Sequence, residues 1–127
     1  MAMRDEYLDM WPHLNRTAVV IRPKRALYDW LNNADPKNAV DPDKDRDDSG
    51  TVYLLQAVDM IDEWEGELKR VYKKIFEAEL WSWMRDDAMW PKDRSWEKFC
   101  EFFEYEFNST IADLDEETEI YEDDVLE

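Results

Sequence analysis

Apolar residues fall into a few stretches whose spacing predicts strands and helices. Residues 17–21 and 51–58 are β-branched or apolar at nearly every position, which is typical of strands buried on both faces. From residue 59 to 85, apolar residues recur every three or four positions, while Glu65, Lys69 and Lys73 fall on another face. This spacing predicts one long helix.

Two shorter helices and a last strand complete the pattern. Leu27, Trp30 and Leu31 form one helical stripe after the proline at 23, and Ser95 is placed to cap a helix whose stripe runs to Phe107. We expect a last strand at residues 110–114. The order β-α-β-α-α-β predicts an α+β fold, a small three-stranded mixed sheet packed by about three helices. Its first two strands would run parallel through a right-handed crossover.

Composition divides the chain into a core region and two acidic segments. Residues 35–50 contain two prolines, one glycine and almost nothing apolar, so we expect a flexible acidic loop. Residues 115–127 hold eight acids and no base and are expected to be a disordered tail. Residues 1–114 would then form a single globular domain. Because both buried strands need two covered faces, the N-terminal segment, the 86–96 connection or a second subunit must cover one of them, and a homodimer stays open.

Charge limits the partners of this chain. Thirty-three acidic against sixteen basic residues give a net charge of −17, which repels nucleic acid and anionic lipid and favours a basic protein partner or no partner. No stretch of 18 apolar residues occurs, and the first 15 residues have acids where a signal peptide needs cations. The single cysteine, Cys100, suits a reducing compartment. We therefore expect a cytoplasmic protein that binds neither nucleic acid nor membrane.

Residues for catalysis or metal binding are scarce. Asp45, Asp47 and Ser49 match the start of a calcium-binding EF-hand loop, but Gln56 stands where the loop needs a bidentate glutamate. We interpret these acids as solubilising and assign no metal. One histidine, one cysteine and two glycines leave no triad, zinc cluster or phosphate loop. The sequence therefore indicates no catalytic residues and no cofactor.

Two groups of side chains are candidates for binding. Arg22, Lys24 and Arg25 lie at a strand end and in the first turn of a helix, where cations oppose the helix dipole and free backbone amides attract anions. They could hold an anion or a partner's carboxylate, or be paired within the chain. Trp81 and Trp90 are candidate partner contacts, with packing in the core as the alternative.

A longer run of residues resembles a known family. The residues are Asn15-Arg16-Thr17-Ala18-Val19-Val20-Ile21-Arg22-Pro23-Lys24, then Asp29-Trp30, then Trp90-Pro91, Arg94, Trp96, Phe99, Phe103, Glu106 and Asp113-Leu114. In these the chain resembles a family of small uncharacterised bacterial proteins, over roughly residues 15–115. The resemblance implies kinship and supplies no activity, cofactor or partner.

Three functional hypotheses follow. The leading one is a non-catalytic protein-binding or accessory protein of the bacterial cytoplasm. The second is an acidic mimic of nucleic acid that inhibits a basic protein, and it requires binding that salt weakens. The third is a small enzyme with a carboxylate-bound metal.

Overall fold

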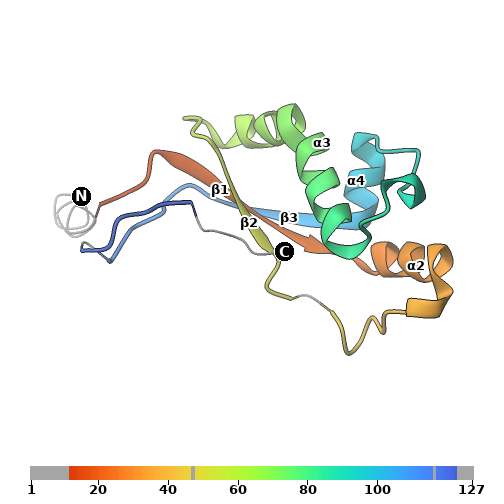
Figure 1. The fold of residues 1–127 in the computed structure, drawn as a ribbon. Helices are drawn as coiled ribbons and strands as arrows, with labels where there is room; N and C mark the ends of the chain where they lie inside the picture. Colours follow the sequence, from red (N-terminus) through yellow and green to blue (C-terminus); the bar gives the residue numbers. More distant parts are fainter. Residues whose placement is uncertain (1–11, 47, 116, 123–127) are drawn as a thin grey trace.

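The computed structural model describes residues 12–46, 48–115 and 117–122. It contains β1 (Arg16–Pro23), α2 (Arg25–Ala34), β2 (Thr51–Gln56), α3 (Trp64–Trp83), α4 (Trp96–Phe102) and β3 (Phe103–Asn108). Short 3₁₀ turns at Pro36–Asn38, Ile61–Glu63 and Asp87–Met89 lie between them. The predicted α+β class and the order β-α-β-α-α-β are confirmed (Figure 1).

The sheet is antiparallel throughout, with β1 between β2 and β3. The expected mixed sheet with two parallel strands is therefore wrong. The reason is that α2 does not cross a face of the sheet: it lies beyond the end of β1 (Figure 1). The connection then returns to that same end, where Thr51 pairs with Ile21. The chain makes a wide hairpin in place of a crossover.

The strand register gives the sheet one covered face and one open face. Val19 lies opposite Tyr53 on β2 and Phe107 on β3, and alternate residues along a strand point the same way. Val19 is fully buried on the face that the helices cover. On the other face, Val52 and Leu54 are 59% and 51% exposed. The expectation that the second strand is buried on both faces is wrong, because β2 is an edge strand and, among the described residues, Val52 and Leu54 are left exposed on this side.

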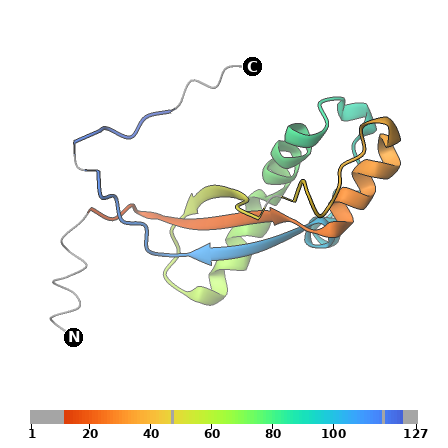
Figure 2. The same ribbon diagram turned by 90° about the horizontal axis from the view of Figure 1, so that it is seen from below.

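Of the two covers expected from within the chain, the structure describes the 86–96 connection in full, and this connection does not lie on that face. The 86–96 connection lies beside α4, at the end of the sheet where α2 also lies (Figures 1 and 2). The N-terminal segment, residues 1–11, is outside the described residues. Residues 12–15 and 110–113 continue beyond the opposite end of the sheet, where His13 pairs with Ala112.

The predicted apolar stretches contribute to one common core. Buried residues from β1, β2, β3 and all three helices form a single contiguous cluster. Phe76 of α3 lies at its centre, with edge-to-face contacts to Phe99, Phe102 and Phe103 at centroid separations of 5.6–6.0 Å. Such aromatic contacts add about 0.5–1.5 kcal/mol each beyond the burial of area. They tie α3 to the junction between α4 and β3.

The third helix is shorter than predicted and is followed directly by a strand. Ser95 caps α4 as expected, its Oγ accepting from the Lys98 amide at 3.2 Å. The helix ends at Phe102 instead of continuing to Phe107, and β3 replaces the strand expected at 110–114. Residues 103–107 alternate aromatic and acidic side chains, and this period of two matches a strand with one buried face. Because Phe103 and Phe107 are four residues apart, they lie on one face in a helix and also in a strand.

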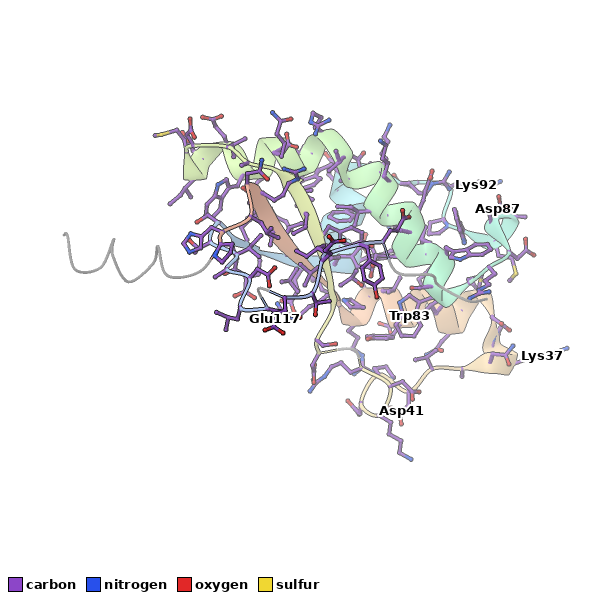
Figure 3. All side chains as sticks on the ribbon, turned by 60° about the vertical axis from the view of Figure 1, so that its left-hand side comes forward. Lys37, Asp41, Trp83, Asp87, Lys92 and Glu117 are labelled. Atoms are coloured by element: carbon purple, nitrogen blue, oxygen red, sulfur yellow. The ribbon has the colours of Figure 1, made fainter. Side chains whose placement is uncertain are left out.

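The acidic connection between α2 and β2 is attached to the core through Val40. The Asn32 side chain donates to the Val40 carbonyl at 2.9 Å and accepts from the Val40 amide at 2.7 Å. This pairing holds Val40 against the core cluster. Lys37 and Asp41 project from the connection on either side of this attachment, whereas Trp83 lies at the end of α3 against α2 (Figure 3).

Candidate functional site

The basic residues singled out from the sequence have partners within the chain. Arg22 projects from the open face of β1, where its Nη1 lies 2.9 Å from a Glu106 carboxylate oxygen on β3. Its Nε donates to the Asp48 carbonyl at 3.0 Å. Arg22 therefore joins the sheet to the loop before β2.

Lys24 and Arg25 contact other parts of the molecule. Lys24 Nζ donates to the Cys100 carbonyl at 3.0 Å, and Arg25 Nε lies 3.8 Å from a carboxylate oxygen of Asp29 one helical turn on. Arg22, Lys24 and Arg25 therefore each have a polar partner within the chain and need no external anion to balance them. The Cys100 thiol is half-buried, and burial, followed by the nearby Glu65 carboxylate, raises its pKa.

The two candidate tryptophans differ in environment. Trp81 is 47% exposed, and the Arg85 guanidinium lies 5.1 Å from the centre of its ring. Trp90 packs against the core, and its indole N–H donates to the Met84 carbonyl at 2.7 Å. Trp83 is part of the packed interior, and Trp81 leans outward as expected for residues two apart on a helix. Of the two candidates, Trp81 and Trp90, only the Trp81 ring is exposed enough to contact a partner.

Only part of the candidate calcium-binding loop lies within the described residues. Asp47 lies outside the described residues. Asp45 accepts from the Asp41 amide at 2.9 Å and donates its own amide to the Asp41 carbonyl at 2.8 Å, which closes a local turn. Within the described ranges, no three histidine, cysteine or acidic side chains come together in a way that would hold a metal ion.

The structure adds a site that the sequence did not indicate, at the outer edge of β2. A groove of about 390 Å³ runs between this edge and α3. We call it the β2–α3 groove. It is lined by Tyr53, Leu54, Leu55 and Gln56 of β2 and by Glu67, Arg70, Val71, Lys74, Ile75 and Ala78 of α3. Its floor is apolar, because Leu55 and Ile75 are only 6% and 3% exposed.

The backbone along this edge has no strand beside it in the described part of the chain. The Gln56 backbone hydrogen-bonds to the Glu67 carboxylate on α3, so the Gln56 amide faces outward, away from β1. Amides alternate in direction along a strand, so those of Val52 and Leu54 also face outward. None of the six β2 residues is charged. Natural edge strands usually carry charges, bulges or prolines that prevent pairing.

One end of the groove is closed by an ion pair. Arg70 donates to both Glu67 carboxylate oxygens, at 3.0 and 2.6 Å. This pairing with Arg70 lowers the pKa of Glu67, and the bond from the Gln56 backbone acts in the same direction. The free part of the edge therefore extends from Val52 to Leu54. Lys74, further along the rim, adds an exposed positive charge.

The groove walls are held together by a buried hydrogen bond. The Tyr53 hydroxyl on β2 donates to the Glu79 carboxylate on α3 at 2.6 Å, and Glu79 is only 5% exposed. Burial, followed by the bond to this carboxylate, raises the pKa of Tyr53 well above its usual value. The strand and the helix are thus fixed relative to each other beside the groove.

Comparison with known proteins adds no relative: no family model, curated protein or solved structure matches the chain. The helices among the described residues are each too short or too polar to cross a membrane. Inferences about function therefore come from the residues of this chain itself.

Sequence reasoning missed the groove because it joins residues from two separate elements. One signal was present: residues 51–56 form an uncharged stretch in a chain in which 39% of residues are charged. Such a stretch is read equally well as a buried central strand or as an open edge.

Proposed function

We propose that this chain is a non-catalytic protein-binding protein of the cytoplasm that takes up an extended segment of a protein partner by strand addition at β2. The observation that carries the proposal is the uncharged edge from Val52 to Leu54, which lies beside an apolar groove and pairs with no other strand of the described residues. Strand addition uses backbone hydrogen bonds for affinity and pockets beside the edge for specificity. A segment of about five residues would pair along this edge.

Charge supports a basic partner over a second copy of the chain. Each molecule carries a net charge of −17, so two copies repel each other, whereas a basic segment is attracted over about a Debye length. The exposed side chains of Val52 and Leu54 would be covered by alternate apolar residues of the same segment. The half-buried thiol with a raised pKa is compatible with a reducing compartment.

The test uses a proline at the free edge. The Leu54 amide faces away from β1, so Leu54→Pro removes a hydrogen-bond donor from the edge without removing a bond of the existing sheet. Random peptides displayed on phage would be selected on the wild-type chain, and the affinity of the enriched peptides measured by fluorescence anisotropy. We expect enrichment of peptides with alternating apolar residues and basic flanks, and a loss of affinity of about tenfold or more in Leu54→Pro.

The control is Leu54→Ala, which shortens the same side chain and keeps the amide. It should lose only a few-fold in affinity, and circular dichroism should be the same for all three proteins. Failure to enrich any peptide, or equal binding by Leu54→Pro and the wild type, would refute strand addition. Binding that is lost in salt but insensitive to Leu54→Pro would instead favour the nucleic-acid-mimic hypothesis.

A further inference from the structure

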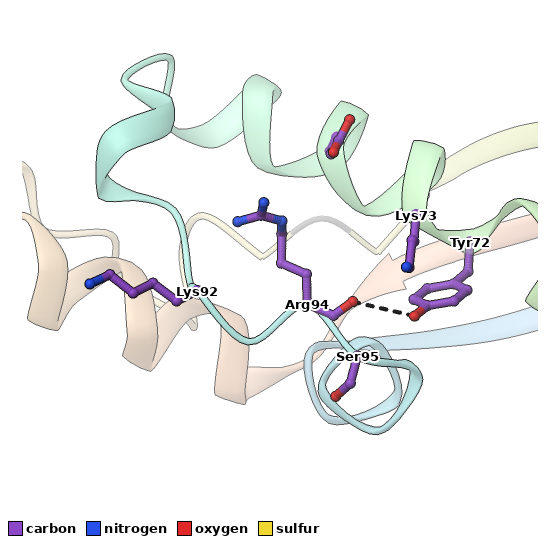
Figure 4. A pocket seen from close by; sticks show the side chains of 6 residues that line it. Tyr72, Lys73, Lys92, Arg94 and Ser95 are labelled. Carbon is purple, nitrogen blue, oxygen red and sulfur yellow. Dashed lines mark hydrogen bonds between the residues drawn. The ribbon is translucent and has the colours of Figure 1, made fainter.

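A second hollow lies on another flank of α3, between that helix and the segment leading into α4. Its volume is about 490 Å³, which falls in the range of small-molecule sites. We call it the Arg94 cleft. It is lined by Tyr72, Lys73 and Glu77 of α3 and by Lys92, Arg94 and Ser95 of the segment (Figure 4). It shares no lining residue with the β2–α3 groove and is independent of the function proposed there.

The charge of this cleft is opposite to that of the molecule. Its lining holds three cations and one carboxylate, in a chain that has 33 acids and 16 bases. Several basic side chains elsewhere pair with carboxylates, as in Arg22–Glu106 at 2.9 Å and Lys98–Glu101 at 2.7 Å, whereas others, such as Lys24, donate to a backbone carbonyl. Within the described ranges, no carboxylate pairs with Lys73, Lys92 or Arg94. A local excess of unpaired cations favours an anionic ligand.

Arg94 is held in place by its own loop. Its Nη1 donates to the Pro91 carbonyl at 2.6 Å, and the residue is half-buried. A guanidinium group has five N–H donors, and this bond uses one of them. Figure 4 shows the guanidinium group extending between the segment and α3. A guanidinium fixed in this way loses little entropy when it forms two parallel bonds to a phosphate or carboxylate group.

The segment that carries Arg94 is itself fixed at several points. The Tyr72 hydroxyl on α3 lies 3.4 Å from the Arg94 carbonyl, which accepts from it. The Asp93 carboxylate accepts from the Ser95 amide at 3.1 Å. Hydrogen bonding from the Ser95 side chain, followed by that from the Ser95 amide, lowers the pKa of Asp93. The Ser95 side chain caps α4. The wall of the cleft is therefore anchored to both helices before any ligand arrives.

We propose that the Arg94 cleft binds a small phosphate monoester that carries a free hydroxyl group. Arg94 would take two phosphate oxygens, with Lys73 and Lys92 adding positive charge nearby. Glu77 lies in the same lining and is exposed. A carboxylate repels a bare anion and accepts a hydrogen bond from a hydroxyl, so Glu77 favours an ester with a hydroxyl over inorganic phosphate.

The probes are glycerol 3-phosphate, inorganic phosphate and glycerol, titrated separately into the ¹⁵N-labelled protein at low ionic strength. Glycerol 3-phosphate should produce saturable amide shifts at Tyr72, Arg94 and Ser95. Inorganic phosphate should bind more weakly at the same residues, and glycerol should shift none of them. Addition of NaCl should weaken binding, because the attraction is electrostatic and partly exposed.

The variants compare equal changes of charge at two places. Lys73→Gln with Arg94→Gln should weaken binding of glycerol 3-phosphate by about tenfold or more. The matched control, Lys37→Gln with Lys44→Gln, removes two charges from the exposed connection before β2. It should change affinity by less than about twofold.

Two further variants keep the proposal testable if loss of the Arg94 tether disturbs the loop. Lys73→Gln with Lys92→Gln changes only exposed side chains and should weaken binding several-fold. Glu77→Gln should strengthen the binding of inorganic phosphate, because it removes a repulsive charge. The absence of saturable shifts with glycerol 3-phosphate would overturn the proposal, as would equal losses in the cleft and control pairs. Equal affinity for inorganic phosphate and glycerol 3-phosphate would overturn the assignment of an ester.

Discussion

At the scale of single residues, the hydrogen bond between Tyr53 and Glu79 matters most for the groove. A carboxylate that is 5% exposed needs donors to replace the water it has lost. The Tyr53 hydroxyl supplies one at 2.6 Å. Because the two residues belong to β2 and α3, the bond also fixes the width of the β2–α3 groove.

Removal of this hydroxyl should destabilise the fold. In Tyr53→Phe the buried carboxylate loses a donor, and we expect the free energy of unfolding in urea to fall by about 1–3 kcal/mol. Tyr105→Phe is the matched control, because its hydroxyl donates to Glu65 at 3.0 Å and that side chain is 52% exposed. The control should cost less than about 1 kcal/mol. An equal loss of free energy of unfolding in the two variants would show that the buried bond stabilises the fold no more than the exposed one.

The same variant should change the dependence of stability on pH. The pKa of Tyr53 is raised in the folded protein, so above about pH 10 the unfolded chain releases a proton that the folded chain keeps. Stability should therefore fall as the pH rises beyond 10, and it should fall less steeply in Tyr53→Phe. Tyr105, whose pKa burial raises to about 12, contributes in the same direction and is unchanged in that variant.

At the scale of elements, the two glycines have opposite roles. Gly66 lies within α3, and a methyl group added there would meet nothing within 4 Å. Gly50 precedes β2 with φ at +73°, and an added methyl group would collide with the Ile21 carbonyl oxygen on β1. The first glycine weakens its helix, whereas the second allows the chain to enter the sheet.

Alanine substitutions should separate these roles. Gly66→Ala should raise the free energy of unfolding by about 0.5–1 kcal/mol, because alanine loses less backbone entropy in a helix. Gly50→Ala should lower it by more than about 1 kcal/mol, through the left-handed backbone and the collision. Chemical denaturation of the two variants beside the wild type measures both effects. Effects of the same sign would contradict the backbone conformation at one of the two sites.

The junction of α4 and β3 shows where prediction of elements from sequence fails. Ser95 was correctly predicted as a cap, because capping depends on a few adjacent residues. The end of the helix was wrong, because Phe103 and Phe107 fit both a period of four and a period of two. Pairing with β1 decides in favour of the strand: Phe103 lies opposite Pro23, and Phe107 lies opposite Val19. That partner is some 80 residues earlier in the chain.

At the scale of the whole molecule, the excess of acids should limit stability. A net charge of −17 on 127 residues produces mutual repulsion that the compact state increases. The ion pairs on the surface are mostly exposed, so each of them contributes little. The folded chain is therefore expected to be sensitive to ionic strength.

Added salt should stabilise the protein. Between about 20 and 300 mM NaCl, the Debye length shrinks from roughly 20 Å to roughly 6 Å, and we expect the thermal midpoint to rise by a few degrees. Choline chloride at the same ionic strength should have the same effect, because screening does not depend on the identity of the cation. A midpoint that falls with salt, or one that rises with sodium alone, would contradict general screening.

The sequence by itself determined the α+β class, the order of the elements, most of the residues of the core and the negative charge. These features depend on local periodicity, on capping and on composition, all of which are written within short stretches of chain. Only the tertiary structure decided the antiparallel direction of β2, the open face that bears Val52 and Leu54, and the two hollows beside α3. The β2–α3 groove and the Arg94 cleft each lie between α3 and a neighbouring segment of the chain, and the space between them is set by how these elements pack on the common core. No local pattern encodes a distance between elements, so these sites become visible only once the elements are packed.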